Sequence, residues 1–158
     1  MLRSAVEGDL DTIIELIHGL ADYEREPDAV HLDPDTLRRH LFGPRPYAEV
    51  ILAETDAGES AGFALFFHNF STWEGVPGIY LEDLFVRPEF RGSGFGKALL
   101  AELARLAVER GCARLEWSVL DWNEPSIQFY RALGALPMDE WTTFRMTGAA
   151  LTDLARRR

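Results

Sequence analysis

The spacing of apolar positions divides the chain into helices and strands. Apolar residues recur every three or four positions from Leu10 to Ala21 and from Gly96 to Arg110, which predicts two amphipathic helices. Short runs rich in β-branched, aromatic and other apolar residues predict strands. The predicted strands are Leu2–Ala5, Ala48–Glu54, Ala61–Phe67, Ile79–Val86, Ala113–Leu120 and Thr142–Met146.

Cap and turn residues add three more helices and place the connections. Asp33-Pro34 is typical of a helix start and Gly43 of its end, while Asn123–Leu133 and Gly148–Ala155 read as two later helices. Asp9 is expected to cap the first helix. The segment TDAGES predicts a hairpin between two strands, and HNFSTWEGVPG, residues 68–78, predicts a loop.

The order of these elements indicates the fold class. A hairpin comes first and a strand–helix–strand–helix–strand passage follows, with no repeat and no linker. We therefore expect one α+β domain over residues 1–158, whose sheet is antiparallel early and parallel in the middle.

Composition and charge narrow the possible partners. The net charge of −10 argues against a nucleic-acid partner, which needs a basic surface. The same charge suits a small cationic substrate, although it also serves solubility. No apolar stretch reaches the ~20 residues of a membrane helix. The N-terminus lacks the apolar centre of a signal peptide, so no membrane association and a cytoplasmic location are expected.

Cysteine and histidine offer little for metal chemistry. Cys112 is the single cysteine, so an internal disulfide is excluded. The four histidines show no HxxxH or HxH spacing. We therefore expect no metal site.

The glycine-rich stretch RPEFRGSGFG, Arg87–Gly96, lies between a predicted strand and a predicted helix. A Walker loop fails because only three residues separate Gly92 from Gly96 and because Lys97 is followed by alanine. A dinucleotide fingerprint fails because Lys97 stands at its third glycine position.

A third pattern, Arg-x-x-Gly-x-Gly, matches Arg91, Gly94 and Gly96. A helix start presents unpaired N–H groups and a partial positive charge, and glycines let a pyrophosphate approach them. Arg91 and Lys97 add positive charge. On these residues alone, a plain strand-to-helix turn that needs positive φ explains the glycines equally well.

The surrounding motifs resemble the GNAT superfamily of acyl-CoA-dependent N-acyltransferases. In that family, Arg/Gln-x-x-Gly-x-Gly/Ala cradles the pyrophosphate of coenzyme A. The segment WNEPSIQFYRALGA, from Trp122 to Ala135, is similar to a second family motif. The stretches YLEDLFV, RGSGFG and WNEPSIQFY resemble the spermidine/spermine and thialysine N-acetyltransferase branch more closely.

The resemblance implies a fold, a reaction and a coenzyme site. It implies a mixed sheet of about six to seven strands flanked by helices, a homodimer, and direct acetyl transfer from acetyl-CoA to a primary amine through a ternary complex. The preceding strand would carry the pantetheine arm on its backbone. The coenzyme-binding residues that it implies are Leu84, Phe85, Val86, Arg91, Gly92, Ser93, Gly94, Phe95, Gly96, Lys97, Asn123, Ser126 and Tyr130.

Amine acetylation needs a proton acceptor and gains from a proton donor. A lysine-like ammonium has a pKa of about 10.4, so little free base exists at neutral pH. Glu82 and Asp83 are adjacent on a strand and are expected to point to opposite faces. The resemblance implies that Glu82 contacts the amine and accepts its proton, directly or through a water molecule. It also implies that Tyr130 donates a proton to the coenzyme sulfur.

Carboxylates and aromatic rings suit a cationic substrate. The substrate-binding residues that the resemblance implies are Tyr23, Glu24, Trp73, Glu82, Glu116 and Trp141. Lysine-like amino acids such as thialysine, small diamines and polyamines such as spermidine all fit this set. The alternatives are a protein N-acetyltransferase and a domain that binds acyl-CoA without catalysis.

Overall fold

A computed structural model describes residues 1–157 of the chain. These residues form two compact units, one of Met1–Leu120 and a second that begins at Asp121. The first unit holds the whole sheet and three α-helices. The second holds two short α-helices.

A five-stranded sheet organises the first unit, with the strands in sequence order from one edge to the other. All neighbouring strands are antiparallel except the last pair, which is parallel, as the element order predicted. The strands are β1 (Leu2–Ser4), β2 (Glu49–Glu54), β3 (Ser60–Ser71), β4 (Val76–Val86) and β5 (Leu115–Trp117).

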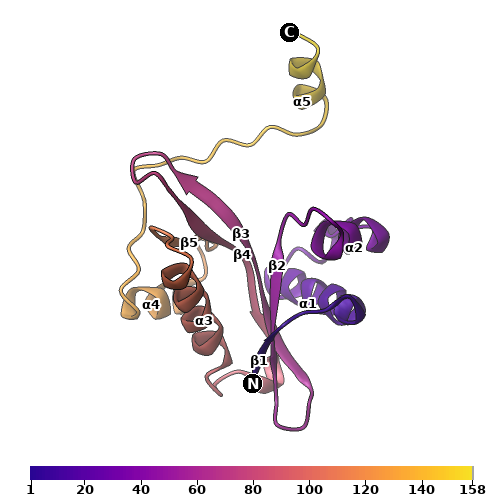
Figure 1. Cartoon of the computed structure of the whole chain (residues 1–158), viewed down its shortest axis with the longest axis vertical. Helices are drawn as coiled ribbons and strands as arrows, with labels where there is room; N and C mark the ends of the chain where they lie inside the picture. The colour runs from indigo at the N-terminus through magenta and orange to yellow at the C-terminus, as the bar shows by residue number, and fades with distance from the viewer. Residues whose placement is uncertain (158) are drawn as a thin grey trace. The chain divides into compact units, whose positions relative to one another are not determined.

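Helices cover both faces of this sheet. Helices α1 (Leu10–Tyr23) and α2 (Pro34–Phe42) lie on one side of it, and α3 (Phe95–Glu109) lies on the other (Figure 1). Three 3-10 turns join the elements: Glu7–Asp9, Pro27–Ala29 and Pro88–Phe90.

The predicted apolar stripes form the two cores. Ile13 and Leu16 of α1 are fully buried and pack in one cluster with Phe63 of β3 and Phe85 of β4. Leu99 and Leu103 of α3 are fully buried on the opposite face of the sheet. Full burial of one such side chain stabilises the fold by roughly 1.5–3 kcal/mol, so these stripes fix which face each helix covers.

The first helices differ in how they are capped. The Asp33 carboxylate accepts a hydrogen bond from the Thr36 backbone N–H at 2.9 Å, so it caps α2 as expected. Asp9 occupies the cap position of α1 but makes no cap bond, which corrects that expectation. Its carboxylate instead accepts two bonds from the Arg3 guanidinium, at 2.8 and 2.9 Å. A charged guanidinium that donates two hydrogen bonds binds a carboxylate more strongly than a neutral backbone N–H group does.

The loop predicted over residues 68–78 is wrong. Strand β3 continues to Ser71 and β4 begins at Val76, so a four-residue turn closes a long hairpin. The glycine that favoured a loop, Gly78, lies inside β4. A Cβ atom there would stand 2.5 Å from the Asn69 Oδ1, so this glycine marks a close approach between strands.

The second unit contains α4 (Glu124–Ala132) and α5 (Gly148–Ala155), both as predicted. The predicted strand Thr142–Met146 is wrong, since no ladder forms there. Within residues 1–157 the sheet therefore has five strands, fewer than the expected six to seven. None of the helices in that range has the length and apolar character needed to span a bilayer.

Candidate active site

A β-bulge interrupts the middle of β4 at Glu82. Leu81 lies opposite Phe66 of β3 and Asp83 lies opposite the adjacent Leu65, so Glu82 is an extra residue without a cross-strand partner. Bulges of this kind bend a strand and redirect its side chains, and they are common beside active sites. The predicted proton acceptor thus occupies an irregular point of an otherwise regular strand.

The bulge changes the face to which the following residues point. Directly opposed residues of an antiparallel pair share a face. Leu81 shares the face of Phe66. The guanidinium carbon of Arg110, the residue after α3, lies 5.8 Å from the centre of the Phe66 ring. Asp83 shares the face of Leu65, which packs in the α1 core cluster. Regular alternation would place Leu81 and Asp83 on one face, so it is interrupted at the bulge, and Asp83 lies on the α1 side of the sheet.

Three carboxylates gather at this point. Glu82 is exposed, and Asp83 and Glu24, the residue after α1, are partly buried. Burial, followed by the charges of Glu82 and Glu24, raises the pKa of Asp83 to about 6. Burial and the charge of Glu82 also raise the pKa of Glu24. These mutual effects show that the structure brings Glu24 and Glu82 together, two residues that the sequence assigned to one site.

Arg91 connects this acidic cluster to the glycine-rich turn. Its guanidinium carbon lies 4.6 Å from the ring centre of Tyr23 and 5.5 Å from that of Phe85. Its Nε donates to the Val86 carbonyl at 3.0 Å. Tyr23 immediately precedes Glu24, so the predicted coenzyme and amine sites adjoin each other. The stacked position also holds the Arg91 side chain in place.

Glycine occupies positions 92 and 94 of the turn for a different reason from position 96. Gly92 and Gly94 have φ values of 83° and 87°, the left-handed region that favours glycine. Gly96 lies within α3, where a Cβ atom would meet only the Val86 Cγ2, at 3.9 Å. Apart from the adjacent residues, no atom of residues 1–157 lies within 4 Å of a Cβ built at Gly92 or Gly94. A plain turn explains the first two glycines but not Gly96, and the space beside all three is open to a ligand.

The N-terminus of α3 suits an anionic ligand. No side chain caps this helix at its N-cap residue, Gly94, and its first turn contains no acidic residue. Lys97 stands in that first turn, exposed and without a hydrogen bond or ion pair in the described part of the chain. A cation is unfavourable at the positive end of a helix unless an anion accompanies it. The residues present therefore fit a pyrophosphate.

Strand β4 leaves one edge open beyond the bulge. Strand β5 pairs only with Ile79, Tyr80 and Leu81, and no other described strand continues that pairing toward Val86. The other edge of β4 remains paired with β3 as far as Val86. An unpaired strand edge can bind an extended chain that carries amide groups.

Two predicted substrate residues of the first unit lie away from the bulge. Glu116 of β5 pairs in register with Tyr80. Its carboxylate accepts a hydrogen bond from Asn69 Nδ2 at 3.0 Å and forms an ion pair with Arg114, whose Nε lies 2.9 Å away. Trp73 lies in the turn between β3 and β4 and is 94% exposed. Six strand residues separate it from Glu82, roughly 20 Å along β4. The chain does not bring Trp73 to Glu82.

The remaining predicted residues lie in the second unit. The Asn123 Oδ1 accepts from the Ser126 backbone N–H at 3.4 Å, so Asn123 caps α4. Tyr130 is partly buried on α4, with its ring centre 5.7 Å from that of Phe129. Trp141 follows in irregular chain and is 75% exposed. The spacing that suggested the second motif therefore places Asn123, Ser126 and Tyr130 on one capped helix.

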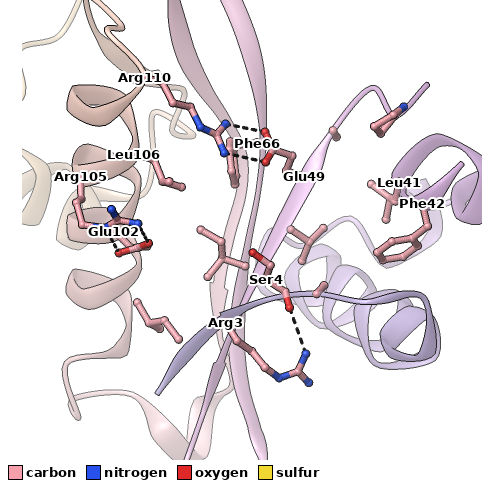
Figure 2. A pocket seen from close by; sticks show the side chains of 16 residues that line it. Arg3, Ser4, Leu41, Phe42, Glu49, Phe66, Glu102, Arg105, Leu106 and Arg110 are labelled. Carbon is pink, nitrogen blue, oxygen red and sulfur yellow. Dashed lines mark hydrogen bonds and ion pairs between the residues drawn. The ribbon is translucent and has the colours of Figure 1, made fainter. Parts of the chain in front are cut away.

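A cavity of about 310 Å³ lies elsewhere in the first unit, among β1, β2, α2 and α3 (Figure 2). None of the residues predicted for the site lines it. Arg110, directly after α3, donates two hydrogen bonds to the Glu49 carboxylate of β2, at 2.8 and 3.0 Å, and Arg105 of α3 pairs with Glu102. Because these charges are mutually paired, the cavity offers no free charge to a ligand.

The sequence pointed to Glu82 but missed the contribution of Asp83. The adjacent Glu-Asp pair in an apolar strand was the available signal, and the bulge that turns Asp83 toward α1 carries no local mark such as a glycine. Residues 1–157 contain no cluster of three or more histidine, cysteine, aspartate or glutamate side chains suited to a metal ion.

Known proteins are similar to this chain in sequence. The acetyltransferase (GNAT) family model matches residues 13–135. A thialysine N-ε-acetyltransferase from Bos taurus is 39% identical over 98% of this chain and 96% of its own length. An L-ornithine N5-acetyltransferase from Arabidopsis thaliana is 42% identical over 75% of this chain and 47% of its own length.

A solved structure has the same fold over almost the whole chain. An integron cassette protein from the mobile metagenome of V. cholerae superposes with a TM-score of 0.81 at 27% identity, covering 99% of this chain and 97% of that one. The chain therefore belongs to the acetyltransferase (GNAT) family and is an N-acyltransferase.

Proposed function

We propose that this protein transfers the acetyl group of acetyl-CoA to the primary amine of a small cationic substrate, by direct transfer in a ternary complex. The observation that carries the proposal is the gathering of Glu24, Glu82 and Asp83 at the β4 bulge, beside the glycine-rich turn. Two of these carboxylates are partly buried, and none of the three makes a side-chain hydrogen bond within residues 1–157. Such a group favours a cationic ligand.

The coenzyme would lie along β4 and across the start of α3. The open edge of β4 from Leu84 to Val86 suits the amide-bearing pantetheine arm, and the α3 N-terminus with Lys97 suits the pyrophosphate. Ser93 and Phe95 lie between the glycines of this turn. Acetyl-CoA supplies the thioester and its acetyl group. The proposed chemistry calls for no metal ion.

Glu82 is the proposed proton acceptor. A primary ammonium with a pKa near 10.4 must lose a proton before its nitrogen can attack a thioester. Glu82 lies exposed at the bulge, where a bound amine can reach its carboxylate directly or through a water molecule. Tyr23 and Glu24, at the end of α1, would hold the cationic chain by ring and charge contacts.

Tyr130 is the proposed proton donor. A thiol has a pKa near 8.5, so protonation of the sulfur as it leaves assists transfer moderately. The Tyr130 hydroxyl would supply that proton. Asn123 and Ser126 at the start of α4 are proposed to help hold the coenzyme, and Glu116, Trp73 and Trp141 are proposed to line the amine site.

The names of the relatives indicate which amines to test first as substrates. One is named for thialysine and another for ornithine, both amino acids whose side chains end in a primary amine. A lysine-like amino acid is therefore the first substrate to test, and spermidine the second. A homodimer, a cytoplasmic location, and the absence of nucleic-acid and membrane partners remain predictions.

A coenzyme A release assay with a panel of amines tests the proposal. The panel contains thialysine, ornithine, spermidine, tyramine and an unstructured peptide with a free α-amino group. We expect turnover with at least one of the small cations and none with the peptide. Turnover with the peptide alone would indicate a protein N-acetyltransferase. Tight acetyl-CoA binding without turnover on any amine would indicate a non-catalytic binding domain.

A further inference from the structure

Arg91 opens the glycine-rich turn, but its side chain lies against α1 and β4. Its guanidinium carbon is 4.6 Å from the ring centre of Tyr23 and 5.5 Å from that of Phe85, and its Nε donates to the Val86 carbonyl at 3.0 Å. Within residues 1–157, no hydrogen bond, ion pair or ring contact joins this guanidinium to the first turn of α3. The expected role of Arg91 at the coenzyme phosphates does not explain this position.

Two nitrogens of the Arg91 guanidinium are available to a ligand. Neither Nη atom makes a hydrogen bond or an ion pair with a residue in the range 1–157. The Nε bond and the two aromatic rings restrict where the guanidinium lies, and the residue is exposed, so a ligand can reach it. Two N–H groups of one guanidinium match the two oxygens of a carboxylate.

We propose that the Arg91 guanidinium binds the α-carboxylate of an amino-acid substrate whose side-chain amine is acetylated at Glu82. The inference rests on the proposed function and narrows its substrate class, because diamines and polyamines carry no carboxylate. Arg91 is then a specificity-determining residue, which favours lysine-like amino acids over amines of the same length.

The charges along β4 match those of a lysine-like amino acid. Negative charge gathers at the bulge, where Glu24, Glu82 and Asp83 lie. The positive charge of Arg91 lies beside Phe85, two residues after Asp83 and roughly 7 Å along the strand. The side-chain nitrogen and the carboxylate carbon of ornithine or thialysine are roughly 6–8 Å apart in an extended chain. One such molecule can therefore place its ammonium at the carboxylates and its carboxylate at Arg91.

The contacts of Arg91 argue against a role as the counter-charge of the acidic cluster. Within residues 1–157, no ion pair joins Arg91 to Glu24, Glu82 or Asp83. Burial and negative neighbours raise the pKa values of Glu24 and Asp83, and the charge of Arg91 is not among the causes. The positive and negative groups thus stay separate, which leaves both for a ligand that carries both charges.

Matched pairs of substrates test the inference, because the members of each pair differ only in the carboxylate. Ornithine is paired with 1,4-diaminobutane, and thialysine with bis(2-aminoethyl) sulfide. At saturating acetyl-CoA, we expect the wild-type kcat/KM to favour the amino acid of each pair. Arg91→Gln should lower this preference about tenfold, because a neutral amide replaces the charged guanidinium. Arg91→Lys, which keeps the charge but not the paired N–H groups, should retain part of the preference.

Arg45→Gln is the matched control, because Arg45 is exposed in a loop and the change removes the same charge. It should leave the preference for the amino acid unchanged. Since both members of a pair are assayed on one variant, effects on folding and coenzyme binding cancel in the ratio.

An unchanged ratio in Arg91→Gln would overturn the inference, and a raised KM for acetyl-CoA beside it would assign the side chain to the coenzyme. If the wild type acetylates both members of each pair equally well, the inference fails and the proposed function stands. If the wild type acetylates neither member of either pair nor any other amine of the panel, the proposed function fails and the role of Arg91 fails with it.

Discussion

The position of Asp83 predicts a trade of stability for function. The pKa of its carboxyl is about 6 in the folded protein, against an ordinary value of 3.8 for an aspartate carboxyl. A folded pKa above the unfolded one favours folding at low pH, and this advantage is lost as the pH rises through the folded value. Asp83→Asn removes the titration, so the variant should be the more stable protein at neutral pH.

The size of this stability difference follows from the pKa shift of the Asp83 carboxyl. About two pKa units at 1.36 kcal/mol each give an upper value of about 3 kcal/mol at pH 8. Between the two pKa values the penalty is partial, and at pH 5 about half of it remains. The free energy of unfolding of Asp83→Asn should therefore exceed that of the wild type by up to about 3 kcal/mol at pH 8, and by about half as much at pH 5.

Urea unfolding at pH 5, 6, 7 and 8 measures this difference directly. Far-ultraviolet circular dichroism follows the helices that pack on the sheet. Asp56→Asn serves as the control with no expected change, because Asp56 is exposed in the turn between β2 and β3 and loses the same charge. If Asp83→Asn is less stable than the wild type at pH 8, the carboxylate has a stabilising partner. If the difference in unfolding free energy between Asp83→Asn and the wild type does not depend on pH, burial does not raise the pKa of the Asp83 carboxyl.

Three further substitutions separate coenzyme binding, chemistry and packing. Lys97→Glu should keep or raise stability by about 0.3–1 kcal/mol, because an acidic residue suits the first turn of α3. The same change should raise the KM for acetyl-CoA roughly tenfold, whereas Arg45→Glu in an exposed loop should not. An acetyl-CoA KM for Lys97→Glu equal to that of the wild type would refute the pyrophosphate assignment. Tyr130→Phe should lower kcat roughly 10²-fold with little change in acetyl-CoA affinity. A large loss of affinity would instead show that the ring packs against the coenzyme. Phe63→Ala, at a fully buried core position, should cost about 3–5 kcal/mol in urea unfolding, and a cost below about 1 kcal/mol would contradict its placement.

Local patterns were sufficient to predict the helices. The predicted helix Gly96–Arg110 differs from α3 by one residue at each end, because an apolar stripe and a following glycine mark it in the sequence itself. The hairpin of β3 and β4 was harder to predict. Gly78 marks a close contact with Asn69 from the neighbouring strand, and only the pairing reveals it. Thr142–Met146 alternates like a strand, but alternation does not supply a partner strand.

The site shows the same division between local and long-range information. The glycine-rich turn and Glu82 could be identified because their residue types and spacing are local. The approach of Glu24 to Glu82 was expected from the resemblance, and the pKa shift of Glu24 shows it. The direction of Asp83 could not be foreseen, since it follows from the register between β3 and β4. A one-residue change of register moves a side chain to the other face.

Analysis of the reaction product decides whether this protein acetylates an amine. Wild-type protein is incubated with acetyl-CoA and thialysine at pH 7.5, and the amine is then analysed by mass spectrometry. We predict that thialysine gains the mass of one acetyl group, in an amount equal to the coenzyme A released, and that the acetyl group sits on its side-chain nitrogen. Coenzyme A release without an acetylated amine, for thialysine and for every other amine of the panel, would contradict the proposed acetyl transfer.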